Sequence, residues 1–144
     1  MRSLAALAVL VFASGCGGGV EPPPKTVKVE GTVNHKGQPL EAGKVILYPS
    51  APPADGKPVR PTVGDVKGGK FTLSTFVAGD GAMPGDYKVS VESMDKEVTM
   101  EEFNEGKRQK SLIPKKYSAM QTSGLTAKIP DQAEPFQLTL ELKD

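Results

Sequence analysis

The stretch TVKVEGTVNHKGQPLEAGKVILYP (residues 26–49) decides the fold class, because its apolar residues recur at every second position. Val27, Val29 and Val33 alternate with charged and polar residues, which is the two-residue period of a strand that is buried on one face. Gly31 interrupts the apolar series, and a glycine inside a strand indicates a bulge or a close contact. The stretch therefore predicts a half-buried strand with a special position at Gly31.

Similar strands are predicted along the rest of the chain. A turn at residues 34–37 leads to a second strand at 44–49. In the strand at 86–93, Ser90 is expected to face outward. About seven short strands with regularly spaced turns are typical of an all-β fold, an antiparallel β-sandwich. The other expected elements are a hairpin about Gly68-Gly69 and strands at 125–129 and 136–142.

Residues 93–124 break the strand rhythm. Thr99 followed by Glu102 fits a helix capping box, and Gly106 is suited to end the helix. We expect one or two helical turns in which Phe103 supplies an apolar side chain to bury, followed by a long loop. The fold is thus expected to carry one short helical insertion.

The composition restricts the class of protein. The chain has 144 residues, of which 38% are hydrophobic and 6% aromatic, with 16 Gly and 13 Pro. It is too apolar for a disordered chain and rich in turn formers. The formal net charge is only +1, so no broad positive field favours nucleic acid. A single cysteine excludes an internal disulfide framework and a cysteine-rich metal site. We expect no cofactor.

The N-terminal residues have the features of a bacterial secretion signal. Met1-Arg2 is a short positive segment, and residues 4–13 are an apolar run that is too short to span a bilayer comfortably. Ala13-Ser14-Gly15-Cys16 then resembles a lipobox, in which the cysteine is acylated and becomes the new N-terminus. The alternatives are an ordinary signal peptide that leaves a free thiol, and a cysteine buried in a core helix.

Cys16 is therefore the predicted lipidation site, with a palmitate-type anchor. The glycines and prolines that follow it suit a tether between membrane and domain. We expect a signal peptide at 1–15, a lipid-anchored flexible tether at 16–25 and a β-sandwich domain at 26–144. The predicted location is the cell envelope, on the periplasmic or cell-surface side of a membrane.

Five motifs follow one another along the predicted domain: Val29-x-Gly31-x-Val33, Gly37-Gln38-Pro39-Leu40, Gly43-x-Val45-x-Leu47-x-Pro49, Gly69-Lys70-Phe71-Thr72-Leu73 and DGAMPGDYKV at 80–89. In this order they resemble the carboxypeptidase regulatory-like, or transthyretin-like, domain of small bacterial lipoproteins. IPKKYSAMQTSGLTAKI (113–129) is similar to the tail segment of such lipoproteins. The resemblance implies a seven-stranded prealbumin-like (Ig-like) β-sandwich that serves as an accessory or binding module, without established chemistry.

Few side chains are candidates for chemistry. His35 is the only histidine and lies in a predicted turn, without a second histidine as partner. Asp55, Asp65, Asp80 and Asp86 lie in or near loops but lack the dense spacing of a calcium loop. We therefore predict no catalytic residue, no metal site and no enzyme activity, with a small hydrolase as the enzymatic alternative.

We expect a non-catalytic envelope lipoprotein that binds or scaffolds an unidentified protein or polysaccharide partner. A carbohydrate-binding module, with Tyr48 and Tyr117 as a sugar platform, is the alternative. The insertion carries apolar and basic side chains that no strand period explains. In the opposite interpretation, Phe103 and Ile113 merely cover an open end of the sandwich. The predicted contact residues are Met100, Phe103, Lys107, Arg108, Lys110 and Tyr117.

Overall fold

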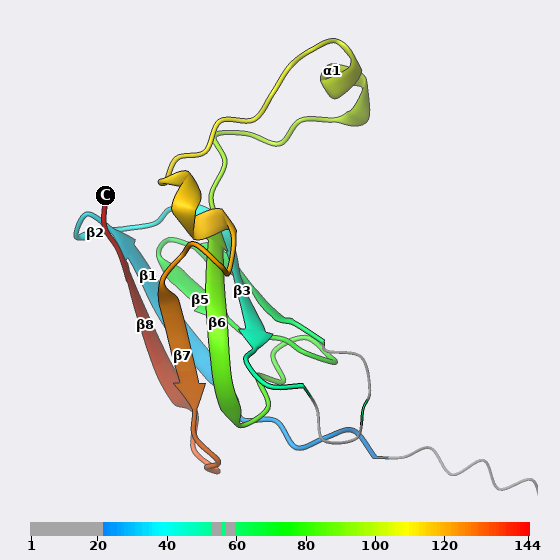
Figure 1. Ribbon diagram of the computed structural model, residues 1–144, viewed down its shortest axis with the longest axis vertical. Helices are drawn as coiled ribbons and strands as arrows, with labels where there is room; N and C mark the ends of the chain where they lie inside the picture. Colours follow the sequence, from blue (N-terminus) through cyan, green and yellow to red (C-terminus); the bar gives the residue numbers. More distant parts are fainter. Residues whose placement is uncertain (1–21, 53–55, 57–59) are drawn as a thin grey trace, which may run out of the picture.

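The computed structural model describes residues 22–52, 56 and 60–144. Two short helical elements, α1 (Met100–Asn104) and the 3-10 helix η1 (Lys115–Ser118), lie between the sixth and seventh strands. None of the helices in these residues is long and apolar enough to cross a membrane. The all-β prediction is confirmed (Figure 1). The strands are β1 (Val29–His35), β2 (Gln38–Pro39), β3 (Ala42–Pro49), β4 (Thr62–Lys67), β5 (Lys70–Thr72), β6 (Gly85–Glu92), β7 (Leu125–Ile129) and β8 (Phe136–Leu142).

One curled sheet contains all of these strands. β2 and β5 pair with successive parts of β1, and β8 pairs along the other edge of β1. The order across the sheet is therefore β8-β1-β5-β4-β3-β6-β7. β7 and β8, the two outermost strands, approach each other where the sheet curls round (Figure 1). The curl encloses one apolar core.

The strand directions give the molecule two ends. Because each neighbouring pair from β1 through β5, β4 and β3 to β6 is antiparallel, β6 runs in the same direction as β1. We call the end at which β1 begins the tether end (residues 22–28, 73–84 and 130–135). The segment after β6 leaves from the opposite end, the arm end (Figure 1).

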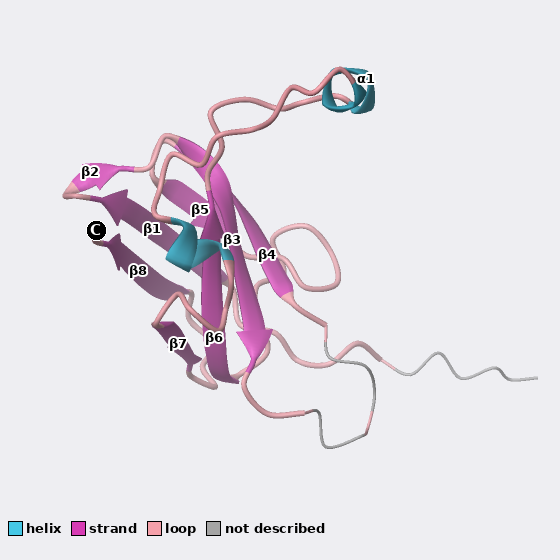
Figure 2. Cartoon of the chain, turned by 45° about the horizontal axis from the view of Figure 1, so that its top comes forward, coloured by secondary structure: helices cyan, strands magenta, loops and turns pink. Residues whose placement is uncertain are grey.

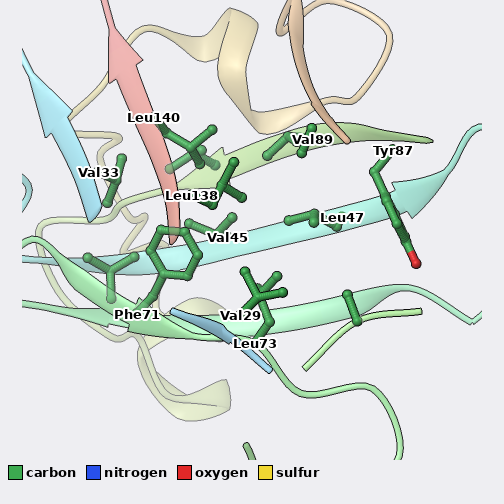
Figure 3. Packing of buried hydrophobic residues seen from close by; sticks show 14 of the residues in the cluster. Val29, Val33, Val45, Leu47, Phe71, Leu73, Tyr87, Val89, Leu138 and Leu140 are labelled. Atoms are coloured by element: carbon green, nitrogen blue, oxygen red, sulfur yellow. The ribbon is translucent and has the colours of Figure 1, made fainter. Parts of the chain in front are cut away.

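The core consists of inward-facing side chains from both halves of the curled sheet (Figure 3). Each fully buried aliphatic side chain contributes about 1.5–3 kcal/mol through the area that it removes from water. The buried residues include all but one of those that the alternation predicted in the first and last strands: Val27, Val29, Val33, Leu138, Leu140 and Leu142. The exception is Phe136, which is only partly buried against the core.

Gly31 marks a close contact, as predicted. A Cβ at this position would lie 2.2 Å from Cζ of Phe71 and 2.6 Å from the carbonyl oxygen of Leu138. Real Cβ atoms do not approach other heavy atoms so closely. The ring of Phe71 therefore occupies the space that a side chain on residue 31 would need, and only glycine fits.

The expectation of a wholly antiparallel sheet is wrong at one pair of strands. β1 and β8 run parallel, from Val29 opposite Phe136 to His35 opposite Leu142. Alternation shows which face of a strand is buried, but it does not show which strand lies beside it or in which direction. After β7 the chain crosses to the other edge of the curled sheet, so β8 adds to β1 instead of forming a hairpin with β7.

The exposure to solvent expected for Ser90, as an outward-facing residue of β6, is also wrong, because Ser90 is fully buried. Its hydroxyl oxygen has no hydrogen-bond partner among the described residues. The chain that returns after α1 packs on the same strand: η1 contacts β6, and the hydroxyl of Ser123 donates to the carbonyl oxygen of Val89. The residue pattern of β6 alone therefore could not predict that a segment 25 or more residues further along the chain covers Ser90.

Candidate interaction site

Between β6 and β7 the chain leaves the sheet and returns, forming a projection that we call the arm (residues 93–112; Figures 1 and 2). Its base is a short two-stranded ribbon in which Met94 pairs with Ser111. The amide of Asp95 donates to the carbonyl oxygen of Lys110, and the amide of Lys110 donates to the Asp95 carboxylate, each at 2.9 Å. These bonds join the two sides of the arm where it leaves the sheet.

The tip of the arm is α1, which begins with the capping box predicted from the sequence. The amide of Glu102 donates to Oγ1 of Thr99, and the amide of Thr99 donates to Oε2 of Glu102, each at 3.2 Å. Gly106 follows the helix with a φ of +88°, a conformation that favours glycine and ends helices. The prediction of a short capped helix is confirmed.

The tip presents apolar side chains to solvent. α1 has no buried residue: Met100 is 77% exposed and Phe103 is 51% exposed. The expectation that the helix buries Phe103 is wrong, because the arm carries α1 away from the core (Figure 2). The alternative interpretation is that Phe103 and Ile113 cover an open end of the sandwich. Of these two residues, only Ile113 is buried.

Arg108 packs against the ring of Phe103. Its guanidinium carbon lies 4.2 Å from the ring centroid, where a cation is attracted by the negative face of the aromatic system. Nη1 of Arg108 also donates to the carbonyl oxygens of Phe103 and Lys107, each at 2.9 Å. Phe103 therefore has one cationic neighbour on the arm, although about half of its surface is exposed.

One basic residue of the tip, Lys107, is partly neutralised by acidic neighbours. Nζ of Lys107 lies 3.3 Å from carboxylate oxygens of both Glu102 and Glu105. The hydrogen bond from the Thr99 amide, together with Lys107, holds the pKa of Glu102 below its ordinary value. Lys107 therefore braces the tip, while Lys110 stands exposed at the base of the arm.

Tyr117 does not belong to this surface, contrary to the prediction from sequence. It lies on η1 and is only 4% exposed. Its hydroxyl donates to the carbonyl oxygen of Lys143 and accepts from the amide of the same residue. The structure thus brings five of the six predicted contact residues together on the arm and places the sixth in the core.

A second exposed apolar feature was missed by the sequence analysis. It lies at the tether end in residues 74–80, which we call the display loop. The amides of Thr75, Phe76 and Val77 donate to the Asp80 carboxylate at 2.7, 2.9 and 3.1 Å. Partial burial raises the pKa of Asp80, but these bonds outweigh it and hold the pKa below its ordinary value. The signal in the sequence is Phe76-Val77, an apolar pair outside any strand period.

The other candidate residues give catalysis no positive support. Nε2 of His35 lies 3.7 Å from Oδ1 of Asp144, which is beyond hydrogen-bonding distance. Within the described part of the chain, no three His, Cys, Asp or Glu side chains converge as metal ligands. The carboxylate of Asp80 is occupied by the amides of its own loop. Asp55 and the predicted lipidation site, Cys16, lie outside the described residues.

The aromatic platform expected for a carbohydrate-binding module is not assembled from the tyrosines, which all lie in described segments. Tyr87 and Tyr117 are buried and Tyr48 is half-buried. A hollow of about 660 Å³ opens over β1, β4 and β5, but its aromatic residue, Phe71, is buried at its floor. The other side chains around it are mostly polar, among them Glu30, Thr32, Asp65, Lys67, Lys70 and Thr72.

No family model matches this chain, and no curated protein matches it. Among solved structures, a 9R-lipoxygenase from Cyanothece PCC8801 aligns with 99% of this chain at 11% sequence identity and a TM-score of 0.39. The chain covers 18% of the length of that lipoxygenase. A TM-score of this size does not establish a common fold.

Proposed function

We propose that this chain is a lipid-anchored envelope protein whose β domain presents the arm as a non-catalytic binding element for another protein. The observation that carries the proposal is the exposure of Met100 and Phe103 on a braced tip. Apolar side chains stabilise a fold by leaving water, and these two do not. An exposed apolar pair of this kind gains burial when a partner covers it, and the contact of Phe103 with Arg108 reduces the ordering cost at one of the two positions.

The finer fold assignment, a seven-stranded prealbumin-like β-sandwich of the carboxypeptidase regulatory-like kind, belongs to this proposal. The curl of the sheet sets β1 and β8 across the apolar core from β3 and β6 (Figure 3), as the two layers of a sandwich are set. The hydroxyl of Tyr87 also donates to the carbonyl oxygen of Met83, four residues upstream, at 2.7 Å. This bond is similar to the tyrosine corner of Greek-key sandwiches.

The anchor is proposed from the sequence around Cys16. Residues 22–28, which follow the tether, and the arm lie at opposite ends of the sheet (Figure 1), so an anchor at Cys16 leaves the arm free to point away from the bilayer. Mass spectrometry of protein extracted from membranes tests this part. The N-terminal peptide should begin at Cys16 and carry acyl chains. A peptide with a free Cys16 thiol, or one that begins elsewhere, would refute the lipid anchor.

Selective recovery of a partner tests the arm. In one variant a Gly-Ser link replaces residues 96–109 and leaves the Asp95–Lys110 pair to close the ribbon. In a second variant, Met100→Ser and Phe103→Ser remove only the exposed apolar groups. Cross-linked partner should be lost from both variants and retained by Lys128→Ser, a matched change of an exposed residue on β7. Equal recovery by all of these chains would remove the arm from recognition.

A further inference from the structure

The backbone of the display loop is held by many hydrogen bonds, although none of residues 74–80 belongs to the apolar core. Besides the three amides bonded to Asp80, the amide of Gly79 donates to Oγ of Ser74 at 2.9 Å. Oγ1 of Thr75 lies 2.6 Å from Oγ1 of Thr62 at the start of β4. Such a density of hydrogen bonds fixes the backbone of residues 74–80 and ties it to the sheet.

This fixed backbone displays an apolar and cationic group of side chains. Val77 is 67% exposed, and the neighbouring Phe76 is half-buried. The guanidinium of Arg60, itself exposed, lies 5.5 Å from the ring centroid of Phe76. An exposed aliphatic side chain, an aromatic ring and a guanidinium are the groups that interfacial amphipathic helices place at the boundary between lipid headgroups and acyl chains, and this loop combines one of each.

The loop lies next to the chain that leads to the proposed anchor. Val27 and Ala82 exchange backbone hydrogen bonds of 2.8 and 3.0 Å. These bonds hold the chain that leads into β1 beside Ala82, two residues after the display loop. Val27 follows Cys16 by eleven residues. Fully extended, that length of chain spans at most about 40 Å. A lipid on Cys16 therefore keeps the tether end within reach of the bilayer surface, where even weak contacts are favoured by high effective concentration.

We infer that the display loop docks on a phospholipid surface, with Val77 and the edge of Phe76 entering the headgroup boundary and Arg60 pairing with a lipid phosphate. This inference rests on the proposed anchor at Cys16. A guanidinium binds phosphate through paired N–H donors, and the aliphatic part of its side chain lies favourably against apolar groups. Docking at the tether end orients the domain so that the arm points away from the membrane.

The chain contains no tryptophan, so one introduced Trp reports its own surroundings. The full chain is recovered from membranes and reconstituted in phosphatidylcholine vesicles with and without brominated acyl chains. Val77→Trp is compared with Met100→Trp, a similarly exposed position at the opposite end of the sheet. The Val77→Trp emission should be lost with brominated lipid and protected from aqueous iodide, and Met100→Trp should show the reverse. Adding Arg60→Glu to Val77→Trp should reduce this loss of emission with brominated lipid, because the phosphate-binding guanidinium is replaced by a carboxylate.

Water-accessible emission from Val77→Trp, without quenching by brominated lipid, overturns the docking inference and leaves the anchor standing. Failure of the anchor gives a different result, because the chain is then missing from the membrane fraction. In that case the thiol of Cys16, the only cysteine, is coupled to a maleimide-headgroup lipid. The same quenching comparison then decides whether the loop docks. A cooperative melt of each variant shows that it is folded.

Discussion

The hydroxyl of Tyr117 lies 2.7 Å from both the amide nitrogen and the carbonyl oxygen of Lys143. It joins η1 to the residue that follows β8. β7 and β8, the two outermost strands, are not paired with each other. One side chain thereby satisfies the backbone groups that a neighbouring strand would otherwise bind. The returning segment after the arm is thus part of the closure of the curled sheet.

Removing this hydroxyl should weaken the closure. Tyr117→Phe keeps the buried ring and deletes both hydrogen bonds, so we expect the free energy of unfolding to fall by about 1–3 kcal/mol. Urea denaturation of the variant and the unmodified chain measures the difference. A stability equal to that of the unmodified chain would mean that solvent replaces the hydroxyl without cost.

The arm and the last strand should differ sharply in their contribution to stability. Leu140 is buried, and Leu140→Ala should cost about 2–5 kcal/mol through lost burial and a residual cavity. Met100→Ser changes an exposed side chain and should alter stability by less than about 0.5 kcal/mol, and Phe103→Ser, which also removes the contact with Arg108, should cost no more than about 1 kcal/mol. Thermal or urea unfolding of the three variants makes the comparison. A large loss of stability from Met100→Ser or Phe103→Ser would contradict the finding that the tip of the arm does not contact the core.

Gly31 should be intolerant of any side chain. Gly31→Ala places a Cβ against the ring of Phe71 and the backbone of Leu138, and overpacking of this kind typically costs about 1–3 kcal/mol. Phe71→Leu in the same chain removes the ring clash but not the backbone clash, so it should restore only part of the loss. Thr32→Ala, at the next residue of β1, is the control: it loses the cross-strand contact with Thr139 but creates no clash, so it should cost less than about 1 kcal/mol. Unchanged stability of Gly31→Ala in urea would refute the close packing.

The strands could be predicted because each carries its own signal. Alternation in 26–33 and 136–142, and the Thr99–Glu102 capping box, are local patterns that the structure reproduces. The parallel pairing of β1 with β8 joins residues that are more than a hundred positions apart. It depends on the path that the chain takes after β7, and residue alternation carries no information about that path.

The candidate site was predictable as a segment but not residue by residue. An apolar side chain outside a strand period is equally consistent with a core contact and with an exposed contact surface. Tyr117 and Phe103 illustrate this: Tyr117 is packed in the apolar core, and Phe103 is carried outward by the ribbon of the arm. Only the three-dimensional path of the chain separates the two cases.

The cap of the tip helix should respond to acid. Because the folded-state pKa of Glu102 is lowered, the cap's stabilising contribution is complete above about pH 4.3, the ordinary glutamate value, and is lost as the pH falls through the lower folded value. NMR signals of the Thr99 and Glu102 amides should report this change. Glu102→Gln retains an oxygen acceptor without a titrating charge, so its cap signals should be much less pH-dependent. An identical acid response in both chains would exclude Glu102 as the cause.

The most direct measurement of the central claim is site-specific photo-cross-linking in native membranes. A benzophenone side chain replaces Met100 at the tip of the arm in one chain and Thr126, an exposed residue of β7, in another. If the arm is the recognition element, irradiation gives a protein adduct of defined mass from position 100 and none from position 126. No adduct from position 100, or the same adducts from both positions, would contradict the account.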